Sequence, residues 1–245
     1  MMSLSLEINP ECIATLLAYA MIIQGTITSL APTLATRHYG GIEIEKDSSN
    51  EMILRRSGYK GLNIGIYIFC LISKGYDMKI PVLFNHLIWV AESLHGLLNQ
   101  KFKKIGPELI ILCIVAWPVV AVLTEADFYL AWRVQVIISS LILIMAAVNP
   151  KSTLEHWAIE DIDNATYAIV AMDVFIYFKL IILSALLAWN QDPLTSVGYT
   201  CLVSVFSSTI IFFFNKDVAK LKLHKGMLSL WPIMMATVAY SILMN

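Results

Sequence analysis

Long apolar runs separated by short polar segments make up most of the chain. Eight stretches approach the roughly 20 apolar residues that a bilayer-spanning helix needs. They are residues 12–31, 59–76, 80–98, 107–124, 129–149, 165–190, 193–214 and 226–244. Period-two alternation is absent, and the runs are too long for barrel strands, so the pattern predicts helices. We therefore expect an all-α fold, a polytopic membrane helix bundle with about eight transmembrane helices.

The composition agrees with a membrane protein and excludes several classes of soluble protein. Of the 245 residues, 58% are hydrophobic and 14% are charged, against about 45–50% and 25% in soluble domains. The net charge of −1 gives no basic excess, so we expect no nucleic-acid partner. Phosphate-binding, dinucleotide-binding and nucleophile-elbow motifs are absent from the sequence, which disfavours ATPases, kinases and soluble-type dehydrogenases. No catalytic residues are predicted.

The positions of the basic residues predict an orientation. If the N-terminus lies on the trans side, the segments 32–60, 99–106, 150–164 and 215–225 face the cytoplasm. These segments hold 13 of the 17 Lys and Arg residues, and the opposite loops hold only Lys74 and Lys79. The positive-inside rule expects such an asymmetry. We predict an integral membrane protein with both termini extracytoplasmic or lumenal, in a membrane that the sequence does not specify.

The two halves of the chain match each other weakly but in the same order. The matched positions are Pro32 and Pro150, His38 and His156, Asp77 and Asp192, and the Trp-Pro pairs Trp117-Pro118 and Trp231-Pro232. The offset falls from 118 to 114 along the chain, as short loop insertions would produce. We predict two parallel four-helix repeats, residues 1–125 and 126–245, because an even number of spans gives both halves one orientation. For the two histidines, an interfacial structural role is favoured over catalysis.

A glycine-rich segment carries a family resemblance. The stretch that runs from Arg55 through Gly58 and Gly61 to Gly65 resembles the start of the second helix in DoxX-like four-helix membrane modules. The resemblance covers about 120 residues twice and consists of helix lengths and small residues. It implies a tandem duplication and, because some members of that family are linked to quinone oxidoreduction, a membrane redox role. The second half departs from the pattern, since the glycines align with Asp173, Ile176 and Leu180 at an offset of 115.

Polar and ionisable residues inside the predicted spans are the candidate site, because they are costly in a bilayer. At 100° per residue, Asn85, Trp89 and Glu92 share one helix face and His95 lies beside Glu92. In the span 165–190, Asp173 and Lys179 are six residues apart and point in different directions. A Glu92–Lys179 contact would join the two halves. We interpret these residues either as a buried ion pair that fixes packing or as a site for a ligand, a proton or a cofactor.

Metal and cofactor binding were weighed for the same residues. Glu92 and His95 form a Glu-x-x-His pair, but di-iron helix bundles need a second such pair and none occurs in a span, so no metal site is predicted. Haem ligation by His86 or His95 is left open, as is binding of a pigment or a quinone, so the cofactor is unknown. The cysteines Cys12, Cys70, Cys113 and Cys201 lie in predicted spans without CxxC spacing, which indicates neither disulfides nor zinc.

Three other charged segments carry weaker expectations. Arg133 lies near one end of its span and can extend to the membrane surface. The acidic segment 155–163 either contacts the basic segment 215–225 or is simply solvated. Residues 40–54 are expected to form a mobile loop or a short interfacial helix.

Two classes of function remain open from sequence. The first is a non-enzymatic integral membrane protein, which acts as a structural or accessory subunit or binds a lipophilic molecule between its two halves. Its partners would be membrane lipids, a lipophilic ligand or other membrane subunits. The alternative is a small proton-coupled transporter, or a quinone-linked membrane redox component.

Overall fold

The fold is built from helices alone across the residues that the structure describes. The computed structural model describes residues 9–39, 44–45, 48–73, 79–99, 105–156, 162–189, 191–216, 218 and 225–244. Some side chains within these helices, those of Glu92 and His95 among them, lie outside the description. The ten helices of this part of the chain confirm the all-α prediction.

Eight of the described helices are long and two are short. The long ones are α1 (Pro10–Leu30), α3 (Ser49–Ile72), α4 (Lys79–Asn99), α5 (Ile105–Leu123), α6 (Phe128–Val148), α8 (Asn164–Ala188), α9 (Pro193–Phe214) and α11 (Lys225–Leu243). The short ones, α2 (Pro32–Tyr39) and α7 (Pro150–His156), follow α1 and α6 directly. Each long helix overlaps one of the eight predicted apolar stretches.

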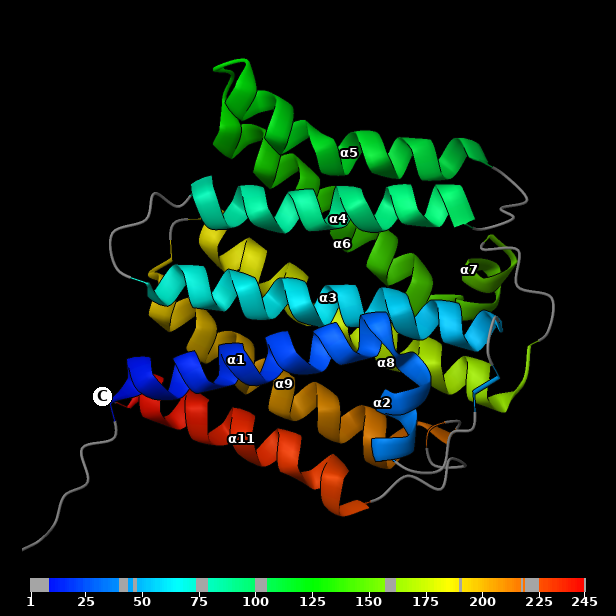
Figure 1. Ribbon diagram of the computed structural model, residues 1–245. Coiled ribbons are helices and arrows are strands. Elements are labelled where there is room, and N and C mark those ends of the chain that lie inside the picture. The colour runs from blue at the N-terminus through cyan, green and yellow to red at the C-terminus, as the bar shows by residue number, and fades with distance from the viewer. Residues whose placement is uncertain are drawn as a thin grey trace, which may run out of the picture.

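The long helices lie side by side, with α4 and α5 at one edge of Figure 1 and α1 and α11 at the other. In the first half α1 contacts α3, α3 contacts α4 and α4 contacts α5. In the second half α6 contacts α8, α8 contacts α9 and α9 contacts α11. The halves meet where α3 packs on α8, where α5 packs on α6 and where α11 packs on α1. Helices α3 and α8 therefore lie at the centre of the bundle.

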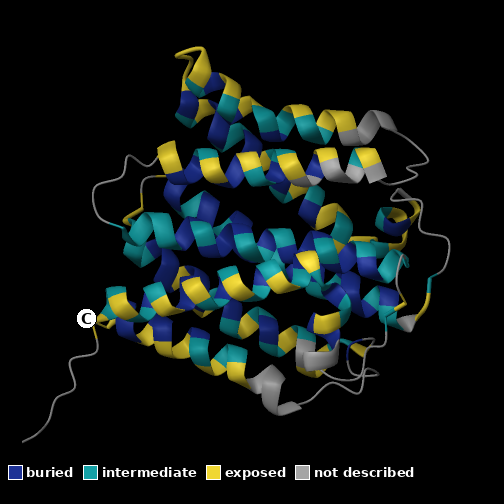
Figure 2. Ribbon diagram, viewed as in Figure 1, coloured by how far each residue is buried: buried dark blue, intermediate teal, exposed yellow. Residues whose placement is uncertain are grey.

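Four described helices are long and apolar enough to cross a membrane: Pro10–Leu30, Phe128–Val148, Ala165–Ala188 and Pro193–Ile211. Three shorter apolar segments lie in other helices, at Lys79–Ala91, Leu109–Leu123 and Leu230–Leu243. Large apolar side chains such as Leu16 and Phe206 are more than half exposed, and exposed positions recur along the outer helices (Figure 2). Exposed apolar faces on apolar helices are what a lipid solvent requires. The chain is a helical membrane protein with four candidate spans.

Helix α3 begins ten residues before the predicted span of residues 59–76. The Ser48 hydroxyl accepts a hydrogen bond from the backbone N–H of Glu51 at 3.2 Å and so caps the new N-terminus. Glu51 pairs with Arg55 one turn later, at 2.7 Å. Residues 49–54, expected in a loop or a separate interfacial helix, are thus the first turns of a long helix. Hydropathy alone missed them because polar residues (Ser49, Asn50 and Glu51) precede three apolar residues, and Arg55 and Arg56 follow them.

Helix α1 packs closely on α3 through small residues. A side chain at Gly25 would collide with the backbone of Leu62, and one at Gly58 would collide with the backbone of Ser29. Small residues let membrane helices approach until their backbones touch. Arg55 supports the same contact, because its guanidinium donates a 3.0 Å hydrogen bond to the carbonyl of Ser29 in the last turn of α1.

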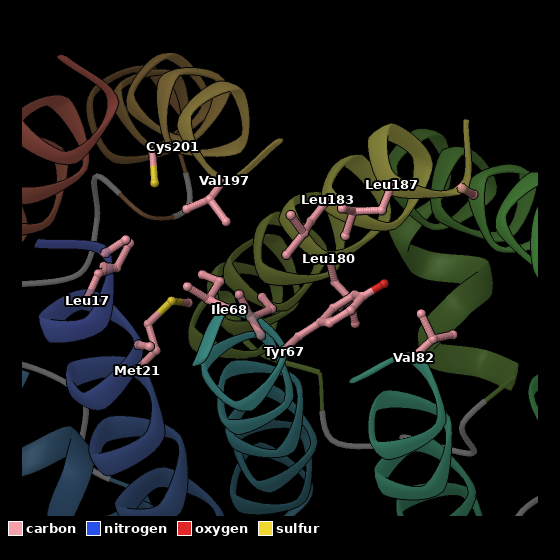
Figure 3. Packing of buried hydrophobic residues seen from close by; sticks show 14 of the residues in the cluster. Leu17, Met21, Tyr67, Ile68, Val82, Leu180, Leu183, Leu187, Val197 and Cys201 are labelled. Carbon is pink, nitrogen blue, oxygen red and sulfur yellow. The ribbon is translucent and has the colours of Figure 1, made fainter. Parts of the chain in front are cut away.

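The core between α1, α3, α8 and α9 is apolar at one end. Leu17, Tyr67, Leu180 and Leu183 are at most 1% exposed, and Figure 3 shows Tyr67 of α3 reaching towards Leu180 of α8. A second apolar cluster, which includes Ile53, Leu154 and Ile169, packs α7 against α3 and α8 at the other end. Between these clusters the interior contains the charged and polar residues described next.

The two proline-containing helices do not match as the Trp-Pro pairs suggested. Pro118 is the fourteenth residue of α5, whereas Pro232 is the eighth residue of α11. Counted from the start of each helix, the two prolines therefore differ by six residues, which is about 9 Å along the helix axis at 1.5 Å per residue. The sequence match at these positions does not mark equivalent places in the two helices.

Candidate functional site: two pockets beside a buried ion pair

A buried ion pair joins the two central helices. Lys60 Nζ of α3 lies 2.7 and 2.8 Å from the two carboxylate oxygens of Asp173 of α8. The Ser57 hydroxyl, also of α3, donates a 2.8 Å hydrogen bond to the same carboxylate. Asp173 is 3% exposed and Lys60 is 9% exposed. Close geometry and an additional donor are the conditions under which a desolvated ion pair is tolerated.

Lys60, which the orientation argument counts together with the loop 32–58, lies three turns inside α3 and is buried. The partner of Asp173 was therefore missed at the sequence level. A signal was present: Arg56, Lys60 and Asn63 recur at the spacing of one helix face, and all three are buried. The predicted span begins at residue 59, so it leaves Arg56 out and hides this helix face.

The larger pocket, with a volume of about 650 Å³, lies on one side of the ion pair. Both halves of the chain form its walls. The apolar part comes mainly from α5 and α6, with Ile111, Ile114 and Val115 on α5 and Ile142 and Met145 on α6. The polar part includes Arg56, Lys60, Ser93, Ser139 and Asp173. The pocket is thus apolar along one side and charged at its inner end.

Two aromatic residues complete the inner end of the larger pocket. Trp89 of α4 and Tyr177 of α8 have ring centroids 5.3 Å apart, and Lys60 Nζ lies 5.1 Å from the centroid of Tyr177. Trp89 is 6% exposed, and its indole N–H has no hydrogen-bond acceptor among the described residues. A buried donor without an acceptor is costly, and Trp89 is one of the residues that line the larger pocket.

A polar layer between α3, α4 and α6 lies near the larger pocket. The Asn63 amide donates a 3.1 Å hydrogen bond to the carbonyl of Asn85, and His86 Nδ1 lies 2.7 Å from the carbonyl of Val82. On α6, the Gln135 amide donates a 2.8 Å hydrogen bond to Ser139. All of these polar side chains are at most 3% exposed. Asn85, a predicted site residue, is thus packed between helices and is not among the residues that line either pocket.

The smaller pocket, of about 170 Å³, lies on the other side of α3 and α8. Its walls come from α1, α2, α3, α8, α9 and α11, and include Gln24, Gly61, Ser208 and Trp231. Lys179 is the charged residue of this pocket; it is 9% exposed. Its Nζ lies 3.8 Å from the ring centroid of Phe175.

The structure separates the predicted site residues into two places. Trp89 and Asp173 line the larger pocket, whereas Lys179 lines the smaller one, in keeping with the six-residue spacing of Asp173 and Lys179. The side chains of Glu92 and His95 fall outside the described residues, so the Glu92–Lys179 contact stays a prediction. No described α4 residue lines the pocket that contains Lys179.

The remaining charged groups serve helix ends. Arg133 Nε donates a 2.8 Å hydrogen bond to the carbonyl of Ala188 at the end of α8. Asp163 caps the start of α8 and accepts hydrogen bonds from the backbone N–H and the hydroxyl of Thr166, at 2.6 and 2.7 Å. Partial burial raises the pKa of Asp163, but these hydrogen bonds outweigh that effect and hold the pKa below its ordinary value.

No metal-binding group of three or more His, Cys, Asp or Glu residues occurs in the part of the chain that the structure describes. The four cysteines are free thiols and two of them are exposed. Comparison with protein-family models, with curated proteins and with solved structures finds no match to this chain.

Proposed function

We propose that the protein is a non-enzymatic membrane protein that binds a lipophilic molecule in the larger pocket, between the two halves of the chain. The observation that carries the proposal is the combination of a cavity of about 650 Å³ with a buried indole N–H on Trp89 that has no acceptor among the described residues. Small-molecule sites have volumes of about 300–1,000 Å³, apolar walls and a few convergent polar groups. The larger pocket has all three properties.

The pocket walls indicate the chemistry of the ligand. Ile114, Ile142 and Met145 suit an apolar body, and α5 and α6 place it on the outer side. The inner end offers the Trp89 donor and the ion pair of Lys60 and Asp173, whose charges already balance each other. A molecule with an acceptor oxygen, such as a carbonyl or an ester, fits this arrangement.

We also infer that the bundle contains two parallel repeats, residues 1–125 and 126–245, with eight spans and both termini on one side. The helices of the two halves support this inference: α1 and α6 have 21 residues each, and a short helix that begins at a proline follows each of them. The long helices also pack on one another in the same sequence in each half: first on second, second on third and third on fourth. Membership in a DoxX-like family stays a prediction that rests on the glycine pattern alone.

The binding proposal is tested by extracting the small molecules that copurify with the protein and identifying them by mass spectrometry. Wild type should retain a lipophilic molecule with an acceptor oxygen at near one equivalent. Ile142→Trp fills the pocket and should lose it. Ile137→Trp is the matched control, because Ile137 is on the same helix and is 50% exposed. Equal retention by both variants, or no retained molecule in wild type, overturns the proposal.

The carrier alternative is favoured by one specific observation. Ser57 lines the smaller pocket and Asp173 lines the larger one, and these residues are joined by a 2.8 Å hydrogen bond. The partition between the pockets therefore includes a polar contact between α3 and α8. Proteoliposomes should show proton-coupled flux that Asp173→Asn abolishes if the protein is a carrier; a tight, inert vesicle supports the binder.

A further inference from the structure

Lys179 is a buried lysine that has no carboxylate partner among the residues that the structure describes. It is 9% exposed and lines the smaller pocket. Among the described residues, no carboxylate forms an ion pair with it, and its recorded neighbour is the ring of Phe175 at 3.8 Å. A cation–π contact orients an ammonium group but does not cancel its charge. A charged side chain at membrane depth usually faces a partner or a cavity, and here it faces a cavity.

The two pockets are lined by corresponding positions of the two halves, with the halves exchanged. Asp173 lines the larger pocket and Ser57, 116 positions earlier, lines the smaller one. Lys60 of the larger pocket corresponds in the same way to Ile176 of the smaller one. Both correspondences use an offset of 116 between the two central helices, α3 and α8, which is one more than the offset of 115 that aligns the α3 glycines with Asp173, Ile176 and Leu180.

The outer helices repeat the correspondence. Ile142 of α6 and Gln24 of α1 are 118 positions apart, the offset already found for the prolines that follow these helices, and each lines its own pocket. Ser93 of α4 and Ser208 of α9 are 115 positions apart and do the same. The smaller pocket is thus a second copy of the larger one, rather than a packing defect.

The charges of the two copies differ. In the larger pocket Lys60 is neutralised by Asp173, whereas in the smaller pocket the corresponding positions are Ile176 and Ser57, and the cation comes from Lys179 instead. We propose that the smaller pocket binds a short-chain carboxylate, whose negative charge pairs with Lys179. This proposal is independent of what occupies the larger pocket.

Three neighbouring hydroxyls already donate elsewhere, so the Lys179 ammonium is the charged donor that the pocket offers to a carboxylate. Thr28 already donates to the carbonyl of Gln24 at 2.8 Å, Ser57 donates to Asp173 and Ser208 donates to the carbonyl of Val205 at 3.1 Å. The ammonium group has three donors and can bond both oxygens of one carboxylate. An anion that needs many hydroxyl donors, such as phosphate, is not matched by this pocket.

The size and the wall residues of the smaller pocket indicate the length and the polarity of the ligand beyond its carboxylate. A cavity of about 170 Å³ equals the liquid volume of about five or six waters, which suits a chain of a few carbons. Met21, Met172 and Met235 line the pocket, and flexible methionines adapt to an apolar chain. Gly61 leaves one wall open, because a Cβ at this position would meet only Gly25, at 3.7 Å.

The experiment measures binding of sodium hexanoate by calorimetry to the full chain in neutral-lipid nanodiscs, with hexanamide as the uncharged analogue. Wild type should bind hexanoate at least about tenfold more tightly than hexanamide, as a lost charge-assisted hydrogen bond predicts. Lys179→Met should remove this preference, and Lys179→Arg should keep it. Lys151→Met is the matched control, because Lys151 is an exposed lysine outside both pockets, and it should bind as wild type does.

A second variant tests whether the ligand binds in the smaller pocket, independently of the charge of Lys179. Gly61→Leu keeps Lys179 but fills the pocket, so it should weaken binding of hexanoate and hexanamide alike, while Gly61→Ala should bind both. The proposal is overturned if wild type shows no preference for hexanoate, or if Lys179→Met keeps the preference of the Lys151→Met control. Retention of the lipophilic molecule by Lys179→Met shows that the two pockets act separately, so failure at one does not count against the other.

Discussion

At the scale of single residues, the Lys60–Asp173–Ser57 network holds two buried charges in close contact. Three groups from two helices meet at distances of 2.7–2.8 Å, and the charged ones are at most 9% exposed. Removal of one partner leaves the other charge buried and alone, which costs more than the pair contributes. The network therefore fixes how α3 and α8 pack, whatever else it does.

The first prediction is that Asp173→Asn destabilises the protein by about 3 kcal/mol or more, because Lys60 loses its counter-charge. The double variant Lys60→Met with Asp173→Leu removes both charges and should recover most of the loss. Thermal unfolding in detergent measures both effects. A single variant as stable as wild type, or a double variant less stable than the single one, contradicts the structural role.

The second prediction concerns the α8 cap and its pH dependence. Because hydrogen bonds hold the pKa of Asp163 below its ordinary value, its charged form stabilises the folded state. That contribution is complete above the pKa of the unfolded chain, near 3.9, and is lost as pH falls through the lower folded pKa. Asp163→Asn should be less stable than wild type near pH 7 by about 0.5 kcal/mol.

The difference between the Asp163→Asn and wild-type melting temperatures should shrink as pH is lowered from 7 towards 3. Both proteins are measured in the same detergent, so that other titrating groups cancel. A difference that is constant over this range means that the Asp163 charge does not stabilise the helix start.

At the scale of elements, the α1–α3 contact depends on glycine at some positions and not at others. A Cβ at Gly25 would overlap the backbone of Leu62, whereas a Cβ at Gly61 would meet only Gly25, at an ordinary 3.7 Å. Backbone cannot move aside as a flexible side chain can, so the two glycines differ in tolerance.

The third prediction follows from this difference. Gly25→Ala should lower the unfolding free energy by about 1–3 kcal/mol through overpacking. Gly61→Ala should be neutral or slightly stabilising, because alanine favours a helix over glycine. The two melting curves decide the matter, and equal effects of the two substitutions would show that backbone approach does not limit this interface.

Helix positions could largely be predicted from the sequence, because apolar stretches of span length match the long helices to within about two residues, except in α3, which starts ten residues before its predicted stretch and ends four residues before the end of that stretch. Glu51, Arg55 and Lys60 lower the mean hydropathy of this part of α3. The helix nevertheless continues through them, because each of the three forms an ion pair within the protein. Hydropathy measures transfer to lipid, and it cannot report partners that arrive from another helix.

At the scale of the whole molecule, the fourth prediction is that both termini lie on the side opposite the basic segments. It follows from eight spans and from the charge asymmetry. Separate fusions of each terminus to alkaline phosphatase and to a green fluorescent protein report the side: the phosphatase should be active and the fluorescent protein dark. Fluorescence at either terminus contradicts an even number of spans with this orientation.

The candidate site could be predicted only in part. Trp89, Asp173 and Lys179 were found because polar residues are rare in apolar helices, and each lines a pocket. Their grouping could not be found, because it depends on which faces of α3 and α8 meet. Lys60 was missed for the same reason, and Asn85 lies between helices instead of in a pocket.

If the two proposed repeats arose by duplication of one four-helix unit, the position of Asp173 opposite Ser57 has a consequence for their origin. In a dimer of identical four-helix units, any residue near the shared axis faces its own copy, so an aspartate at this place would confront a second aspartate. Two carboxylates at such a distance cannot both remain ionised. Fusion of the units into one gene removes that restriction, since one copy can acquire the acid while the other supplies a hydroxyl. A fused chain can change one of the two corresponding residues alone, whereas a symmetric dimer always changes both.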